Sequence, residues 1–239
     1  MKFIYGPVKS RRLGNSLGVT LTPYKTCSFD CVYCQLGLTT VNTLERQEFF
    51  KVNEVISELK IFLSHADLKA NPINYITLSG SGEPTLYSGI SALIQEIKKL
   101  TQIPVCVITN SSLLFKEEVR RGLLAADVIM PTLNAVTPEA FARICRAHAD
   151  VNIENIISGL IALRNEYRGK ILLEIMLVKG INDSLKEIEK LREAIIPVNP
   201  DKIFLTRPDR MTCEDWVQPP DEKTLQKIKE VLGPRCEIV

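Results

Sequence analysis

Residues 17–34 read LGVTLTPYKTCSFDCVYC, in which an apolar stretch is followed at once by a loop with three cysteines. Residues 17–22 are short and apolar, which is typical of a buried strand. Cys27, Cys31 and Cys34 then place three thiols within eight residues, close enough to surround one metal centre. This stretch predicts a strand that leads into a metal-binding loop.

The rest of the chain alternates short apolar runs with amphipathic stretches. The apolar runs predict further buried strands at residues 75–79, 104–109, 127–130, 171–178 and 202–206. Apolar residues at three- and four-residue spacing predict helices at 52–64, 88–100, 116–125, 153–166, 184–195 and 221–232, and Thr137-Pro138-Glu139 opens a short further helix. Six such units with right-handed crossovers predict an α/β fold, a partial (β/α)6 parallel barrel with its active site at the carboxyl ends of the strands.

Length and composition are those of one globular domain. With 239 residues, 45% of them hydrophobic, we expect a single core domain over residues 1–239. The sequence contains no uncharged apolar run of about 18 residues, and residues 1–12 lack the apolar stretch of a signal peptide. We therefore expect a soluble, cytoplasmic protein with no membrane partner.

Net charge and cysteine number narrow the function only in part. A formal charge of +2 is too small to imply a nucleic-acid partner by itself, and it does not exclude one. Seven cysteines without a secretory signal argue against a disulfide framework and favour reduced thiols, some of them metal ligands.

The spacing of the three loop cysteines favours a four-iron cluster. Three protein ligands leave one of its four irons open to a substrate or cofactor. The alternatives are a zinc ion with a fourth ligand from elsewhere, or three cysteines that act as small buried hydrophobes. Only Cys31 and Cys34 have the CxxC spacing of a zinc knuckle, and no second pair or nearby histidine completes a zinc site.

The pattern CxxxCxxC, with the aromatic Tyr33 before the last cysteine, resembles the signature of the radical S-adenosylmethionine (SAM) superfamily. The resemblance implies an enzyme with a [4Fe–4S] cluster on Cys27, Cys31 and Cys34, whose open iron chelates the amino and carboxylate groups of SAM. An electron, from a donor such as flavodoxin or ferredoxin, then splits SAM into methionine and a 5′-deoxyadenosyl radical. Tyr33 is expected near the adenine.

A second motif, Ser79-Gly80-Ser81-Gly82-Glu83-Pro84, follows the second predicted strand. Its glycines let the backbone approach a ligand closely. It resembles the superfamily motif that receives the methionine amino group, with Ser81 as a departure between the two glycines. The resemblance implies SAM contacts from Gly80, Ser81, Gly82 and Glu83, and the alternative is an ordinary glycine-rich turn.

Polar residues also end the later strands. Asn110 follows the third strand, Thr132 and Asn134 the fourth, and Lys179 the fifth. The resemblance implies that Thr132 or Asn134 binds the SAM ribose, that Asn110 contributes to the cofactor site, and that Lys179 lies near the adenine or the methionine carboxylate. The alternative is that Asn110, like Asn182, makes only a turn.

Several shorter motifs resemble a subgroup related to the wyosine tRNA synthetases, the 4-demethylwyosine synthases. The motifs are Ser10-Arg-Arg-Leu-Gly14, Lys25-Thr-Cys27, Gln35-Leu-Gly37 and Lys179-Gly-Ile-Asn-Asp183. The resemblance implies a tRNA-like substrate. Those enzymes hold a second cluster on cysteines upstream of the radical SAM motif, whereas this sequence has no cysteine before Cys27. The remaining cysteines are widely separated, as core or surface residues are: Cys106, Cys145, Cys213 and Cys236.

Basic residues flank the first and sixth predicted strands, at Arg11, Arg12, Arg207 and Arg210. They are placed to meet phosphate or carboxylate groups at the barrel mouth, or to form surface ion pairs. RNA modification is the favoured function. The alternatives are a radical SAM enzyme acting on a protein, peptide or small metabolite, and a non-catalytic iron–sulfur or zinc protein. The sequence identifies no catalytic residue.

Overall fold

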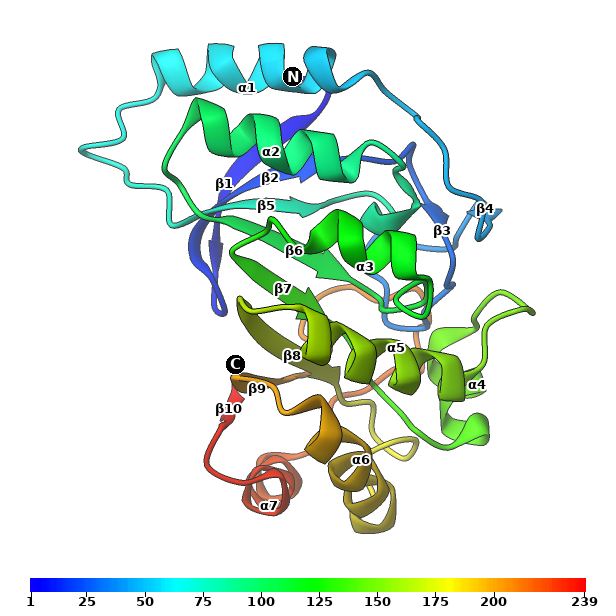
Figure 1. Cartoon of the computed structure of the whole chain (residues 1–239). Helices are drawn as coiled ribbons and strands as arrows, with labels where there is room; N and C mark the ends of the chain where they lie inside the picture. Colours follow the sequence, from blue (N-terminus) through cyan, green and yellow to red (C-terminus); the bar gives the residue numbers. More distant parts are fainter.

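A computed structural model describes residues 1–239, built around a curved sheet of eight strands in the order β1-β2-β5-β6-β7-β8-β9-β10 (Figure 1). The strands of this sheet are β1 (Ile4–Ser10), β2 (Gly14–Thr20), β5 (Tyr75–Ser79), β6 (Val105–Thr109), β7 (Val128–Pro131), β8 (Lys170–Met176), β9 (Lys202–Thr206) and β10 (Cys236–Ile238). A separate two-stranded sheet joins β3 (Thr26–Cys27) to β4 (Val41–Asn42).

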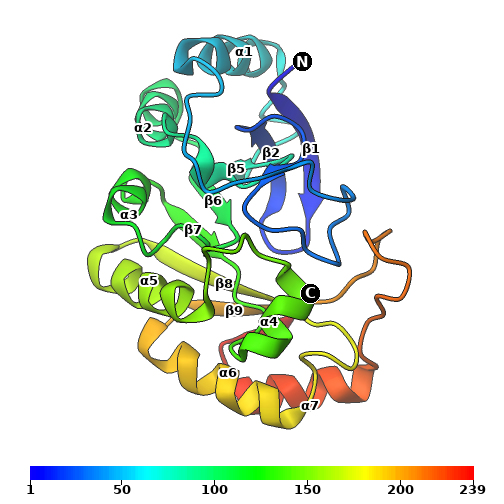
Figure 2. The ribbon, with the colours of Figure 1, turned by 90° about the vertical axis from the view of Figure 1, so that its right-hand side faces the viewer.

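The helices are α1 (Val52–His65), α2 (Ile90–Leu100), α3 (Glu117–Leu123), α4 (Pro138–Cys145), α5 (Ile153–Glu166), α6 (Leu185–Val198) and α7 (Glu222–Leu232), with a 3-10 turn at Pro84–Leu86. All except α4 lie in an arc along the outside of the curved sheet (Figure 2). None of these helices is long and apolar enough to cross a membrane.

The partial parallel barrel predicted from the sequence is confirmed. Every neighbouring pair from β2 through β5, β6, β7 and β8 to β9 is parallel, and β10 adds a further parallel strand beside β9. The sequence did not predict β1, which pairs with β2 as an antiparallel edge strand. Five of its seven residues are exposed, and Gly6 and Pro7 interrupt its apolar pattern, so it lacks the signature of a buried strand.

Two strand boundaries differ from the sequence prediction for local reasons. β2 begins at Gly14 rather than at residue 17, because its first residues pair with β1 in the hairpin. β8 ends at Met176 rather than at residue 178, because the Val178 amide donates to the Asn182 side chain at 2.8 Å and the chain turns there.

Alternate strand residues face two different apolar cores. On β8, Ile171, Leu173 and Ile175 belong to the large core under the helices, whereas Leu172 packs on a smaller cluster inside the barrel. Leu13, from the turn between β1 and β2, completes that inner cluster. The hairpin turn therefore fills part of the barrel interior, and the functional site lies toward the carboxyl ends of the strands.

Gly159, on α5, allows this helix to lie directly against the chain between β6 and α3. A Cβ atom at this position would stand 2.5 Å from the Leu114 carbonyl carbon and from the Phe115 amide nitrogen. Both neighbours are backbone atoms, which cannot move aside as a flexible side chain does.

We predict that Gly159→Ala destabilises the protein by roughly 1–3 kcal/mol, because the overpacking outweighs the better helix propensity of alanine. Gly122→Ala on α3 is the matched control, since its Cβ would meet nothing nearer than 3.6 Å. The control should be stabilising by about 0.5–1 kcal/mol. Urea unfolding of both variants measures the difference, and equal effects would contradict the close-contact explanation.

Candidate active site

The cysteine loop, residues 27–34, follows β2 and is closed by short-range pairing. β3 and β4 pair in parallel and bring its two flanks together. The Cys34 amide donates to the Cys31 carbonyl oxygen at 3.0 Å, which makes a tight turn between the last two cysteines. All three cysteines are residues of intermediate exposure, so the loop does not seal them inside the core.

The C-terminal end of α4 holds the cysteine loop in place. The Asp30 amide donates to the Cys145 carbonyl oxygen at 3.1 Å, and the Val32 amide donates to the Ile144 carbonyl oxygen at 3.0 Å. The rings of Phe29 and Phe141 pack edge to face with centroids 5.7 Å apart. The loop is therefore positioned by an element more than a hundred residues further along the chain.

The surroundings of Cys27 and Cys31 raise the pKa of both thiols. Burial, followed by the nearby Glu83 carboxylate, raises the pKa of Cys27 to about 12. The contact with the Cys145 thiol, together with burial, raises the pKa of Cys31 well above its usual value. Because iron binds thiolates, assembly of a cluster must release these protons and is favoured by higher pH.

Cys34, in contrast, lies beside a positively charged group. Lys25 is only 3% exposed, and its ammonium group donates to the Cys34 sulfur at 3.1 Å without forming an ion pair with any carboxylate. A buried charge without a counter-ion is costly. An iron–sulfur cluster held by three thiolates is an anion that compensates it, so the residues of this loop fit such a group.

A single metal ion fits less well. No group of three or more His, Cys, Asp or Glu side chains is arranged to hold one. In a four-iron cluster each cysteine binds a different iron, so the thiols need not converge on one point. The geometry gives no support to the zinc alternative.

The glycine-rich loop lies directly against the entry to the cysteine loop. The Lys25 amide donates to the Ser81 carbonyl oxygen at 2.6 Å, and the Glu83 amide donates to the Thr26 carbonyl oxygen at 3.2 Å. A Cβ atom on Gly82 would lie 1.9 Å from that Thr26 oxygen, so only glycine fits. Gly80 has φ +108°, a left-handed conformation that favours glycine.

The Glu83 carboxylate anchors the glycine-rich loop to the end of β6. It is 2% exposed and accepts hydrogen bonds from the Thr85 amide and hydroxyl, the Thr109 hydroxyl and the Asn110 amide, at 2.6–3.0 Å. Burial raises the pKa of Glu83, and these hydrogen bonds oppose the rise. With its oxygens already engaged, Glu83 positions the loop, and a direct contact with SAM stays a prediction.

Asn134 joins the cysteine loop to the ends of two strands. Its Nδ2 atom donates to the Tyr33 hydroxyl at 2.6 Å, and its Oδ1 atom accepts the Met176 amide at 2.8 Å. Asn182 donates to the Asn134 carbonyl oxygen at 2.7 Å. Asn182 is therefore more than a turn residue, because it holds the end of β8 against the end of β7.

Asn110 connects the same region to the first cysteine. Its Nδ2 atom lies 2.9 Å from the Ser28 hydroxyl and 3.6 Å from the Cys27 sulfur. Ser28 in turn shares a hydrogen bond of 2.6 Å with Ser112. The sequence analysis missed both serines, since neither has a recognisable spacing. Thr132 lies beside this group, where its carbonyl oxygen accepts the Ser111 hydroxyl at 2.9 Å.

The structure gathers most of the residues predicted to bind SAM at the mouth of the barrel. Those linked to the cysteine loop, directly or through one another, are Tyr33, Gly80, Ser81, Gly82, Glu83, Asn110, Thr132 and Asn134. Lys179 stands apart: it is exposed, and its amide donates to the Gln218 carbonyl oxygen at 2.9 Å. The SAM contacts of all nine residues stay predictions.

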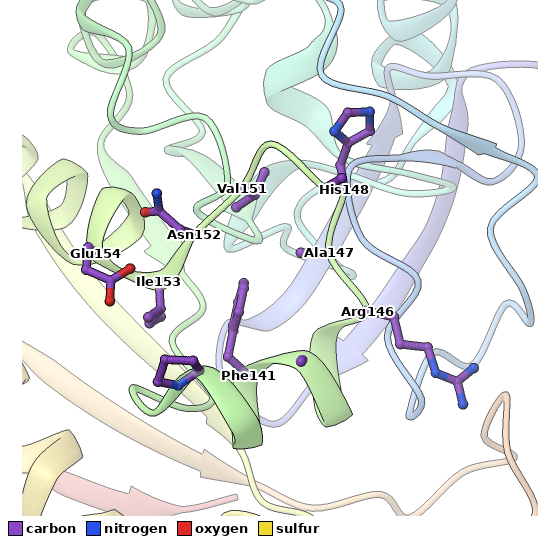
Figure 3. A pocket seen from close by; sticks show the side chains of 11 residues that line it. Phe141, Arg146, Ala147, His148, Val151, Asn152, Ile153 and Glu154 are labelled. Atoms are coloured by element: carbon purple, nitrogen blue, oxygen red, sulfur yellow. The ribbon is translucent and has the colours of Figure 1, made fainter.

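A separate pocket of about 340 Å³ lies between α4 and the segment that leads to α5 (Figure 3). Phe141 contributes to its wall, and Arg146, His148 and Glu154 are among its polar residues. None of the residues predicted to bind iron or SAM lines it. The pocket is therefore separate from the residues predicted to bind the cluster and SAM.

The family is shown by comparison with known proteins. The model of the radical SAM superfamily matches residues 21–195, a range that contains the whole cysteine loop, and the chain belongs to this superfamily. It is therefore a radical SAM enzyme, and the cofactors of its class are a [4Fe–4S] cluster and SAM. More closely, it is similar to a UPF0026 protein of Methanocaldococcus jannaschii, with 35% identity over 98% of this chain and 73% of that protein.

The chain is also similar to three further proteins, each of which is longer than this chain. The chain is 40% identical over 99% of its length to a Brachyspira hyodysenteriae protein named GTPase Obg, but it spans only 34% of that protein. A GTP 3′,8-cyclase of Limosilactobacillus fermentum is 26% identical over 77% of this chain and 51% of its own length. The solved structure of TYW1 with a lysine-pyruvate adduct is 18% identical, with a TM-score of 0.70 over 91% of this chain and 72% of that one, which shows the shared fold.

We predict that replacing Cys27, Cys31 or Cys34 with alanine abolishes binding of the cluster, because each is expected to supply one of its three protein ligands. Iron and sulfide content after anaerobic reconstitution measures this, together with the charge-transfer absorption. Cys213→Ala, outside the loop, is the control and should keep its iron. Wild-type iron content in any of the three loop variants would overturn the assignment.

We predict that Glu83→Gln destabilises the protein by roughly 1–3 kcal/mol, because the amide group turns a donor toward the Asn110 amide or the threonine donors. Thermal unfolding of the iron-free protein measures the loss. Glu96→Gln on α2 is the control, since Glu96 forms only an exposed pair with Lys99. An equally small effect in both variants would show that the carboxylate does not anchor the loop.

Proposed function

We propose that this radical SAM enzyme cleaves SAM reductively and modifies an RNA substrate of the tRNA type, with the electron delivered by a donor such as flavodoxin or ferredoxin. When bound, the cluster and SAM supply a 5′-deoxyadenosyl radical that abstracts a substrate hydrogen. The observation that carries the substrate class is a group of three arginines, Arg11, Arg12 and Arg210, of which Arg210 contacts Gln35 at the end of the cysteine loop.

Two of these arginines are held by carboxylates. Arg12 forms an ion pair with Glu174 of β8. Leu172 lies on the same face of β8 as Glu174 and packs on the inner cluster, so this ion pair faces the barrel interior. Arg11 pairs with Asp209 at 2.7 Å. Burial lowers the pKa of Arg12, and the charges of Arg11 and Arg210 lower it further, so the three guanidinium groups influence one another.

Arg210 is the member of the group without a carboxylate partner. Its guanidinium donates to the Gln35 side chain at 2.9 Å, which ties the segment after β9 to the end of the cysteine loop. The Glu214 amide makes a second tie by donating to the Val32 carbonyl oxygen at 3.2 Å. Arg210 thus places a free guanidinium charge next to the cluster ligands, where a substrate phosphate fits.

Exposed aromatic side chains lie in the segment after β9 and just before the cysteine loop. Trp216 is 49% exposed and Tyr24 is 63% exposed. Sequence-specific RNA binding relies on unpaired bases that stack on aromatic rings while arginines meet the backbone. Together with the motifs that resemble the wyosine tRNA synthetases, these features support an RNA loop as the substrate.

A second candidate substrate is a free guanine nucleotide. The similarity to GTP 3′,8-cyclases favours it, and Arg210 suits a triphosphate as well as an RNA backbone. A free nucleotide needs no exposed aromatic ring outside the barrel for base stacking. The exposed Trp216 therefore favours RNA as the substrate. A peptide or another metabolite is a further outcome of the experiment below.

The test is an anaerobic assay of the reconstituted, dithionite-reduced enzyme with SAM for 5′-deoxyadenosine and methionine. We expect tRNA to raise the amount of 5′-deoxyadenosine above that seen with SAM alone. Stimulation by GTP and not by tRNA would replace the proposed substrate with the second candidate. Stimulation only by a peptide or metabolite pool would overturn both nucleic-acid and nucleotide substrates.

We predict that Arg210→Gln weakens tRNA binding several-fold and makes it less dependent on salt, with a salt slope smaller by about 1. Filter binding across a salt series measures both quantities. Arg168→Gln is the control, because this exposed residue precedes β8 at the opposite end of the strands. Equal effects of the two substitutions would show only a general loss of positive charge.

A further inference from the structure

Lys25 occupies a position where a lysine is unfavourable unless its side chain is needed. Its φ of +57° lies in the left-handed region, which residues other than Gly, Asn and Asp seldom adopt. The backbone is fixed on both sides, since its amide binds the Ser81 carbonyl oxygen and its own carbonyl accepts the Thr40 and Val41 amides at 3.1 and 3.2 Å. A glycine would make the same turn without strain.

The side chain of Lys25 is directed at the cluster ligands. Its Nζ atom lies 3.1 Å from the Cys34 sulfur, and this is the one side-chain hydrogen bond that it makes. The cation thus faces the last of the three predicted cluster ligands.

The role of Lys25 follows from its lack of a carboxylate counter-ion. Two other cations that are not fully exposed each have a carboxylate, since Arg120 has Glu166 at 2.8 Å and Arg146 has Glu214 at 2.5 Å. Lys25 has none, although it is buried to 3% exposure. Its remaining donors are available to the sulfur atoms of a cluster, and hydrogen bonds and charge at those atoms set the potential of the cluster.

We propose that Lys25 is a positioning residue that raises the reduction potential of the [4Fe–4S] cluster and holds Cys34 as a ligand through an N–H···S hydrogen bond. Reduction adds one electron and makes the cluster more negative by one charge. A fixed cation at the sulfur therefore stabilises the reduced form more than the oxidised form. This inference depends on the cluster alone and not on the identity of the substrate.

The test is a redox titration of the reconstituted cluster, followed by electron paramagnetic resonance without SAM or substrate. Lys25→Met keeps the length of the side chain and removes its charge. We expect the equilibrium constant for reduction to fall at least about tenfold, which corresponds to about 59 mV for one electron. Lys25→Arg keeps the charge and should recover most of this shift. Lys60→Met, on the exposed face of α1, should match the wild type.

Each outcome decides the proposal. A Lys25→Met protein with wild-type iron content and a wild-type potential would overturn it. Should Lys25→Met fail to keep its cluster, iron content in Lys25→Arg becomes decisive: retention supports a role for the charge, whereas loss in both variants overturns it in favour of packing alone. Circular dichroism of the iron-free proteins checks that all variants fold.

Thermal unfolding gives a second readout that does not need an intact redox signal. Loading the cluster stabilises the native state by mass action, and the ion pair between Lys25 and the cluster is part of that gain. The rise in melting temperature on reconstitution should be smaller in Lys25→Met than in Lys60→Met. An equal rise would mean that the ammonium group contributes nothing to binding of the cluster.

Discussion

The contact between the Thr26 carbonyl oxygen and the glycine-rich loop is the constraint on which the site depends. This oxygen accepts the Glu83 amide at 3.2 Å, and a side chain on Gly82 would collide with it. The contact holds the loop predicted to receive the methionine part of SAM against the residue that precedes the first cysteine. Two loops that must meet one small cofactor are thereby fixed to each other by backbone atoms, which leaves them little freedom to drift apart.

Hydrogen bonds between buried polar groups, rather than apolar packing, connect this contact to the rest of the site. Glu83 links the glycine-rich loop to the end of β6 by accepting a hydrogen bond from the Asn110 amide. The Asn110 side chain then links this strand end to the cysteine loop through its hydrogen bond with Ser28. On the other side, Asn134 ties Tyr33 to the end of β8. A buried polar group without a hydrogen-bond partner costs free energy. Any movement of these loops that breaks the hydrogen bonds is therefore unfavourable.

The fold was largely predictable because buried parallel strands are apolar and short, and the helices between them are amphipathic. That signal fails at β1, an exposed edge strand interrupted by Gly6 and Pro7. The spacing of the three cysteines predicts a shared cluster, and this assignment stays a prediction. The support of the loop by α4 and the Asn182 contact with Asn134 were not, because they join residues dozens of positions apart and no local pattern records such pairings.

The cations of the site differ in whether a carboxylate already neutralises them, and this difference assigns their roles. Arg12 is held by Glu174 and Arg11 by Asp209, so these guanidinium groups shape the barrel interior and its rim at little net charge. Lys25 and Arg210 lack such partners and contact two consecutive residues at the end of the cysteine loop, Cys34 and Gln35. A buried charge without a counter-ion is costly, whereas an exposed charge is solvated by water. The buried Lys25 therefore suits the predicted anionic cluster, and the exposed Arg210 remains available to a phosphate of the proposed substrate.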